Sequence, residues 1–177
     1  MKKVLCSIAT VSILFGLNAN ADVGVLTKII DGDTVKFGND TCRLANIDTP
    51  ESNFNNRLDK TVKNCNIKPI EIIEAGKKSS KHLSTYLKVG QEYKYTVVTK
   101  SDNYGRKICL INIDNNKTVN LQMVEDGYAY PYYYYIPSQL KDKYKKALEN
   151  AKINKKGLFD KNENVINCLE KGVWYVE

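Results

Sequence analysis

The order of apolar and polar residues predicts five short β-strands with one helix inserted between the third and the fourth. Residues 24–37 combine β-branched side chains with a central Asp-Gly turn, which is typical of a β-hairpin. Residues 41–47 predict the third strand, and residues 92–99 and 107–114 predict two more that are joined by a polar turn. Because such an order is typical of an OB-type barrel, we expect an α+β fold in which a five-stranded barrel carries helices.

Three segments have the spacing of helices. Residues 70–88 place Ile and Leu at helical intervals and end before a glycine. Residues 120–127 predict a short helix with Asn120 as its N-cap, and residues 137–157 predict a longer helix that ends at a glycine. His82, the only histidine, lies on a basic face of the first of these helices, so we expect it at the surface rather than in a metal site.

The remaining segments suggest how the chain is organised. Residues 1–21 contain two lysines, an apolar run and a final Ala-Asn-Ala, which is the form of a cleaved signal peptide. This predicts export to the periplasm or the exterior, with no membrane contact after cleavage; an uncleaved anchor is the alternative. We expect residues 22–160 to form the domain, with a polar loop at 53–68, and residues 161–177 to form a tail that is packed on or tethered to it.

Length and charge restrict the number of domains and the class of binding partner only slightly. The chain of 177 residues fits one domain. Its formal net charge of +7 favours polyanionic partners such as nucleic acid, but it does not specify one.

Acidic and arginine side chains concentrate in three short stretches. These are DGDTV (31–35), CRLANIDTPE (42–51) and DNYGR (102–106). Asp33 and Asp48 lie near strand ends and Glu51 follows closely, so their oxygens suit a hard cation such as Ca²⁺ or Mg²⁺. Arg43 and Arg106 could grip phosphate oxygens through forked hydrogen bonds. Each stretch alone is weak evidence for a site, since Asp-Gly, for example, is a common turn. Together the three stretches supply the groups that phosphodiester chemistry needs.

The order of these three stretches resembles the staphylococcal nuclease-like (thermonuclease) family. The resemblance covers residues 23–160 and continues through VNLQMVEDGYAYPYYYY and KKGLFD. It implies a five-stranded OB barrel with three helices. It also implies the following roles: Asp33 and Asp48 as Ca²⁺ ligands, Thr49 as a ligand through its main-chain carbonyl, Glu51 as general base or water-orienting carboxylate, and Arg43 and Arg106 as phosphate-binding groups.

The tyrosine-rich segment YAYPYYYYIPS holds six of the chain's twelve tyrosines. The resemblance places Tyr104, Tyr133 and Tyr135 in a nucleotide pocket, where rings accept any base by stacking. Alternation in an extended segment would turn Tyr132 and Tyr134 to the other face, so we expect those two to pack or to line the barrel rim. An amphipathic strand edge without a binding role is the alternative for the whole run.

The resemblance implies a calcium-dependent, sugar-non-specific endonuclease and exonuclease. It would hydrolyse DNA and RNA with little sequence preference, leave 3′-phosphate ends and act as a monomer. Two other classes remain open: a non-catalytic OB module that binds single-stranded nucleic acid, and an envelope interaction protein that uses its tyrosines. The three acids favour catalysis, although Asn103 stands where the family often has a lysine.

Four cysteines remain after the signal segment. Cys42 and Cys109 lie in predicted strands, where a thiol can pack as a small apolar group. Cys65 lies in the predicted loop and Cys168 in the predicted tail, both outside the compact family domain, so we expect a Cys65–Cys168 disulfide that fastens the tail. Four free thiols, or a bond from Cys42 to an outer cysteine, are the alternatives.

Overall fold

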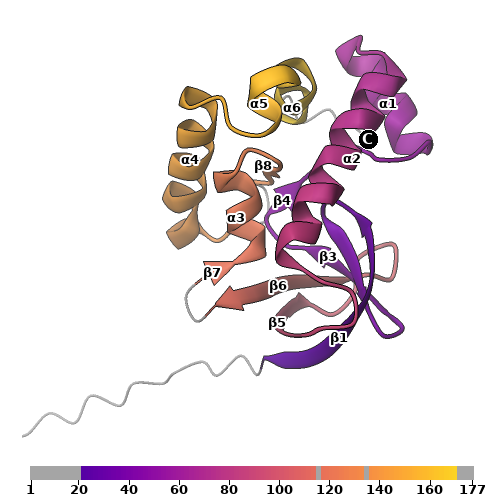
Figure 1. Cartoon of the computed structure of the whole chain (residues 1–177), viewed down its shortest axis with the longest axis vertical. Coiled ribbons are helices and arrows are strands. Elements are labelled where there is room, and N and C mark those ends of the chain that lie inside the picture. Colours follow the sequence, from indigo (N-terminus) through magenta and orange to yellow (C-terminus); the bar gives the residue numbers. More distant parts are fainter. Residues whose placement is uncertain (1–20, 115–116, 134–135, 171–177) are drawn as a thin grey trace, which may run out of the picture.

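The computed structural model describes residues 21–114, 117–133 and 136–170 (Figure 1). Almost all of the predicted signal peptide lies outside these residues, as do Tyr134 and Tyr135. Within the described part, a β-barrel carries helices against one end and one side (Figure 1). No helix in that part is both long enough and apolar enough to cross a membrane.

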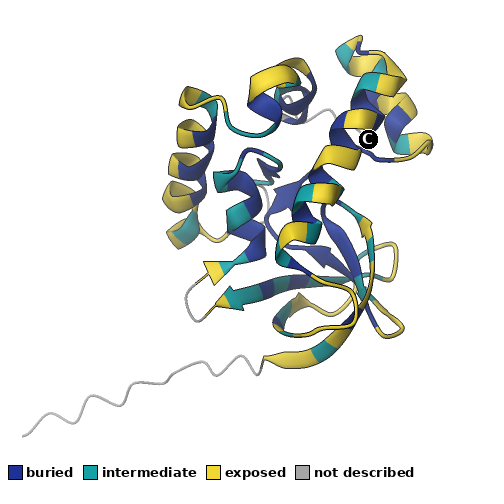
Figure 2. Ribbon diagram, viewed as in Figure 1, coloured by how far each residue is buried: buried dark blue, intermediate teal, exposed yellow. Residues whose placement is uncertain are grey.

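Five strands close the barrel and confirm the predicted OB-type α+β fold. They are β1 (Asp22–Asp31), β2 (Thr34–Phe37), β3 (Asp40–Leu44), β5 (Glu92–Thr99) and β6 (Lys107–Asp114). β1 is long enough to pair with β2 through one half and with β5 through the other. β2–β3 and β5–β6 are antiparallel, and a parallel β3–β6 pairing closes the barrel. Figure 2 shows the buried residues gathered inside the barrel and under the helices.

The predicted third strand is broken. β3 ends at Leu44, and Asn46 has a left-handed backbone with φ of 67°. The chain then forms β4 (Ile47–Asp48), which pairs with β8 (Tyr130–Pro131) instead of continuing β3. A further short strand, β7 (Lys117–Thr118), pairs with β6. The break matters because it sets Asp48 outside the barrel wall, beside the tyrosine-rich segment.

The described residues contain more helices than the three implied by the resemblance. They are α1 (Asn56–Cys65), α2 (Pro69–Tyr86), α3 (Val119–Glu125), α4 (Ser138–Ile153), α5 (Leu158–Lys161) and α6 (Glu163–Glu170). The predicted loop at 53–68 was wrong, because Asn55 caps α1 and Leu58 is fully buried beneath it. Of the predicted tail, the described residues form α6, which buries Val165 and Ile166.

Both pairs of remaining cysteines are bonded. Cys65 in α1 is joined to Cys168 in α6, the pair that the sequence predicts, with 6.0 Å between their Cα atoms. Cys42 and Cys109 were expected to pack as thiols, and that expectation was wrong, because they also form a disulfide, with a Cα separation of 5.8 Å. These two residues lie on β3 and β6, and the parallel pairing of those strands brings them within disulfide range.

His82 is not the simple surface residue that we expected. Its Nε2 lies 2.7 Å from Asp126 Oδ2, and its ring stacks on Tyr128 with 4.0 Å between centroids. Tyr86 donates a second hydrogen bond to the same carboxylate oxygen, at 2.6 Å. The histidine therefore helps to hold α2 against the end of α3.

Asn120 ties α3 to the barrel rather than capping it. Thr118 is the N-cap, because its side chain accepts from the Leu121 N–H. Asn120 is fully buried; its Nδ2 donates to the carbonyls of Ala45 and Cys109 at 2.9 Å, and its Oδ1 accepts from Ile111 N–H at 3.1 Å. One side chain thus holds the segment after β3 against β6, where the barrel closes.

We expect Asn120→Leu to lower the free energy of unfolding by about 3 kcal/mol, because main-chain groups that it pairs would be buried without partners. Urea unfolding followed by circular dichroism measures the change. Gln139→Leu, at an exposed position of α4, is the matched control and should stay within about 0.5 kcal/mol of the parent. Equal midpoints for the two variants would contradict the structural role of Asn120.

Candidate active site

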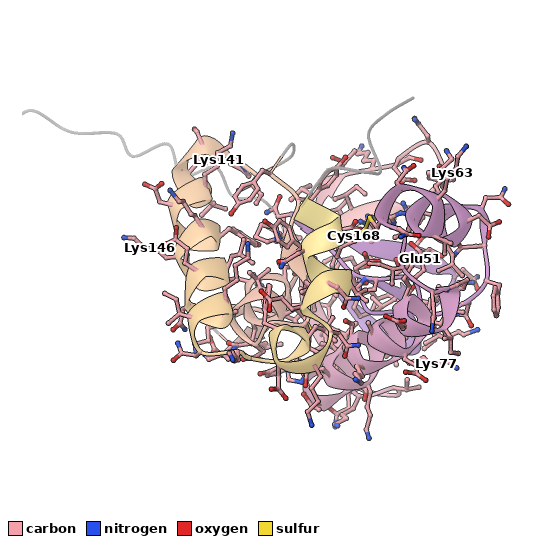
Figure 3. All side chains as sticks on the ribbon, turned by 90° about the horizontal axis from the view of Figure 1, so that it is seen from above. Glu51, Lys63, Lys77, Lys141, Lys146 and Cys168 are labelled. Atoms are coloured by element: carbon pink, nitrogen blue, oxygen red, sulfur yellow. A yellow bond between two sulfur atoms is a disulfide. The ribbon has the colours of Figure 1, made fainter. Side chains whose placement is uncertain are left out.

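The loops that carry the acids meet at the end of the barrel, under α2. Asp33 lies in the turn between β1 and β2, and Glu51 follows β4. Glycine permits the close approach of α2: a Cβ at Gly76 would overlap the carbonyl oxygens of Pro50 and Glu51, and one at Gly32 would overlap Ser79. The two glycines therefore let α2 pack closely against both acid-bearing loops, which fixes the positions of the loops. Figure 3 shows Glu51 within the body of the molecule.

Arg43 joins two of the predicted acids. It projects from β3, with Nη1 2.5 Å from Asp33 Oδ2 and Nη2 2.7 Å from Asp48 Oδ1. Its side chain is 11% exposed. Burial opposes its charge, but Asp33 and Asp48 outweigh burial and raise the pKa of Arg43. Burial likewise opposes the charge of Asp33, whereas Arg43, Arg57 and the Thr34 hydroxyl lower the pKa of Asp33 below its usual value.

Glu51 is held beside this pair but in a different electrostatic setting. It is 6% exposed, and its Oε2 accepts from Asn55 Nδ2 at 2.6 Å. Burial raises the pKa of Glu51, against the opposing effects of Arg57 and Asn55. A buried carboxylate with a raised pKa is suited to accept a proton near neutral pH.

Arg57 is a member of the cluster that the sequence did not reveal. Its Nη2 lies 2.6 Å from both carboxylate oxygens of Asp48, and its Nη1 lies 3.3 Å from Glu51 Oε1. It stands on the first turn of α1, within the segment that was predicted to be a loop. The apolar spacing of Leu58, Val62 and Cys65 was the available signal for that helix.

Arg106 and Tyr104 line a cavity together with Glu51. The cavity has a volume of about 1110 Å³, and its lining includes Arg43, Glu51, Arg57, Tyr104 and Arg106. Arg106 is held by Asp102, whose Oδ2 lies 2.9 Å from Nε and 2.8 Å from Nη2. Tyr104 is 84% exposed. Arg43 and Arg106, far apart in sequence, therefore face one space, as the predicted pair of phosphate-binding groups requires.

The predicted faces of the tyrosine run are reversed where the structure describes them. Tyr132 lines the cavity, whereas Tyr133 packs against the hydrophobic core. Alternation fails because only Tyr130 and Pro131 belong to a strand, β8, and the chain leaves the extended conformation after it. Tyr135 lies outside the described residues.

The predicted calcium ligands suit a hard cation by their chemistry. In the described part of the chain, no three His, Cys, Asp or Glu side chains are grouped as a metal site. The predicted ligand set consists of two carboxylates, Asp33 and Asp48, and the main-chain oxygen of Thr49. The guanidinium of Arg43 already bridges the two carboxylates. Thr49 Oγ1 is buried without a hydrogen-bond partner.

The charge around these ligands also favours a cation. Asp31 adds a fourth carboxylate, and burial together with Asp33 and Glu51 raises the pKa of Asp31 to about 7. Burial is the larger cause of that shift, but the count of charges points the same way: Asp31, Asp33, Asp48 and Glu51 stand against Arg43 and Arg57. The residues present therefore fit a divalent cation with oxygen ligands.

The five-stranded barrel and the arginine–carboxylate centre beside its cavity agree with the family that comparison with known proteins finds. Residues 41–161 match the family model described as staphylococcal nuclease homologue, and the chain belongs to that family. It is 28% identical over 149 residues to Endonuclease YhcR of Bacillus subtilis (strain 168), a match that covers 79% of this chain and 12% of that protein. It is 30% identical over 143 residues to the SPbeta prophage-derived endonuclease YokF of the same organism, covering 77% of this chain and 44% of that one. The chain thus spans less than half the length of either relative.

Proposed function

We propose that the protein is an exported calcium-dependent nuclease that hydrolyses phosphodiester bonds of DNA and RNA with little sequence preference. The observation that carries this proposal is a buried cluster in which Arg43 pairs with Asp33 and Asp48, while Arg43 and Glu51 line one cavity. Two relatives named as endonucleases support it. The retained acids favour catalysis over a binding module that would need none of them.

The proposed mechanism assigns each side chain a separate task. Arg43 and Arg106, which line the same cavity, bind the non-bridging oxygens of the phosphate and stabilise the charge that develops there. Glu51 orients the attacking water and accepts its proton, aided by the raised pKa of its carboxyl group. The attack forms a bond from phosphorus to the water oxygen and breaks the bond to the 5′ oxygen, which takes up a proton from solvent and leaves a 3′-phosphate.

Asp33, Asp48 and the Thr49 carbonyl would hold the calcium ion. When bound, it would neutralise phosphate charge as a Lewis acid. Tyr104 and Tyr132 offer rings at the cavity for bases or sugars, and stacking on rings does not select a particular base. This accounts for the low sequence preference that we propose.

We also propose an oxidising location and a monomeric state. Two disulfides suit a periplasmic or secreted protein, because cytosolic thiols are usually kept reduced. All the proposed catalytic side chains come from one chain, so the mechanism needs no second copy.

Cleavage of nucleic acid with and without calcium tests the proposed function. We expect the exported protein to degrade plasmid, single-stranded DNA and RNA in Ca²⁺, to stop in excess chelator, and to resume when Ca²⁺ is restored. Phosphatase treatment of the products should change their gel mobility, and end analysis should place the phosphate at the 3′ end. Calcium-independent binding without cleavage would favour the OB binding module, and neither binding nor cleavage would favour the envelope interaction protein.

A further inference from the structure

The use of arginine in this chain is sharply localised. Lys and Arg together number 27, yet only three of these residues are arginine: Arg43, Arg57 and Arg106. All three line the same cavity. Exposed lysines such as Lys63, Lys77 and Lys146 project outward from the surface in Figure 3. A chain that otherwise uses lysine has arginine only where a planar group with several N–H donors faces this space.

Two of these arginines have roles in the proposed function, and Arg57 has none. It is the most exposed of the three: its side chain is 33% exposed, against 11% for Arg43 and 26% for Arg106. Lys60, one turn further along α1, lines the cavity beside it. Arg57 and Lys60, from the first two turns of α1, therefore form a cationic wall of the space that would admit the substrate.

The position of α1 is fixed firmly enough to aim this side chain. Asn55 caps the helix, Leu58 is buried beneath it, and Cys65 bonds its last turn to α6. Asn55 also reaches Glu51. Helix α1 is thus attached to Glu51 through Asn55 at one end and to α6 through Cys65 at the other.

The present contacts of Arg57 compete with a cation for the same atoms. Both Asp48 oxygens lie 2.6 Å from Nη2 of Arg57, and one of them also accepts from Arg43. A cation held by both Asp48 oxygens would take the position that Arg57 Nη2 occupies now, and its charge would repel the guanidinium. A displaced guanidinium on α1 would still face the cavity.

We propose that Arg57 is a third phosphate-binding guanidinium, which leaves Asp48 for a phosphate of the nucleic acid when a cation binds Asp48. The inference rests on the proposed function for the identity of the substrate. It makes Arg57 a residue that binds and positions the substrate, contributed by a helix that stands where a loop was predicted. It also couples the cation to the substrate, since each favours the arrangement that the other requires.

Calcium titration of the whole exported protein, without nucleic acid, tests the exchange at Asp48. We expect Arg57→Gln to raise calcium affinity by about tenfold or more, because an opposing charge in direct contact is removed. Lys60→Gln is the matched control, since it removes one charge from the same helix and cavity without a direct contact to Asp48. The proposal is overturned if Arg57→Gln raises affinity no more than Lys60→Gln does.

Arg57→Lys is a second, more conservative variant that keeps the test valid if Arg57→Gln does not fold. It keeps the positive charge but not the two-oxygen contact, so it should raise calcium affinity by a smaller factor than Arg57→Gln. Circular dichroism should show both variants folded; if only Arg57→Lys folds, calcium affinity equal to that of the parent overturns the proposal.

Substrate binding tests the second half of the inference. A fluorescent single-stranded oligonucleotide is titrated in Ca²⁺ with proteins that carry Glu51→Gln, so that cleavage does not interfere. Adding Arg57→Gln should weaken binding by about tenfold and lower the slope of log affinity against log salt by about 0.7, the value for one lost phosphate contact. Adding Lys77→Gln, on the exposed face of α2, should leave the affinity unchanged.

Unaltered oligonucleotide affinity after Arg57→Gln would overturn the phosphate-binding role. Failure of the proposed function is distinguishable, because calcium titration needs no cleavage. If the parent protein cleaves nucleic acid in calcium but Arg57→Gln changes neither calcium affinity nor oligonucleotide affinity, this inference is refuted and the proposed function stands.

Discussion

Glu51→Gln is expected to lower kcat for DNA cleavage by about 10²–10⁴-fold, the usual contribution of a positioned general base. The amide has the shape of the carboxylate and keeps an oxygen that can accept from Asn55, so the fold and DNA binding should persist. Single-turnover cleavage in saturating Ca²⁺ measures the loss. Glu74→Gln, at an exposed position on α2, is the matched control and should leave the rate unchanged.

The pH dependence of the rate gives a second measure of the same role. Burial raises the pKa of Glu51, and a base works only when deprotonated, so activity should fall as pH falls through that raised pKa. Glu51→Gln should lack this acid limb in its residual activity. Near-normal turnover, or an unchanged acid limb, would remove Glu51 from the role of proton acceptor.

The barrel could be predicted from the sequence because its signals are local. β-branched residues and the Asp31-Gly32 turn mark β1 and β2, and the acids lie in short motifs whose order is itself a pattern. The Cys42–Cys109 bond could not be read in this way. It depends on the parallel pairing of β3 with β6, strands that are far apart in the chain.

Helix α1 shows a different limit of sequence patterns. Its residues are mostly polar, and much of what holds it comes from outside the segment: Leu58 enters a core built by other elements, and Cys65 is bonded to α6. Arg57 reaches the site because it lies on that helix, so a prediction that missed the helix also missed Arg57. Asn120 misled for a related reason, because a buried amide that serves the barrel looks the same in sequence as an N-cap.

Arg43→Lys is expected to reduce kcat by about 10²–10³-fold, in the range for loss of one well-placed donor to a developing oxyanion. Lysine keeps the charge, but a single ammonium cannot replace Nη1 at Asp33 and Nη2 at Asp48 while also presenting N–H groups to phosphate. The loss should therefore combine a weaker phosphate grip with looser placement of the two predicted calcium ligands. Steady-state kinetics and calcium titration of the same variant separate these two effects.

Tyr104→Phe is the comparison that isolates the guanidinium. It retains an aromatic ring in the cavity and removes only a hydroxyl from a side chain that is 84% exposed, so we expect a small change, mainly in KM. The two variants together divide the cavity into a part that grips phosphate and a part that accepts bases. If Arg43→Lys and Tyr104→Phe cost the same in kcat, that division is wrong. Arg43 would then serve chiefly to balance the charge of Asp33 and Asp48. The phosphate would be held by Arg106 together with Arg57 and Lys60 of α1, which line the same cavity.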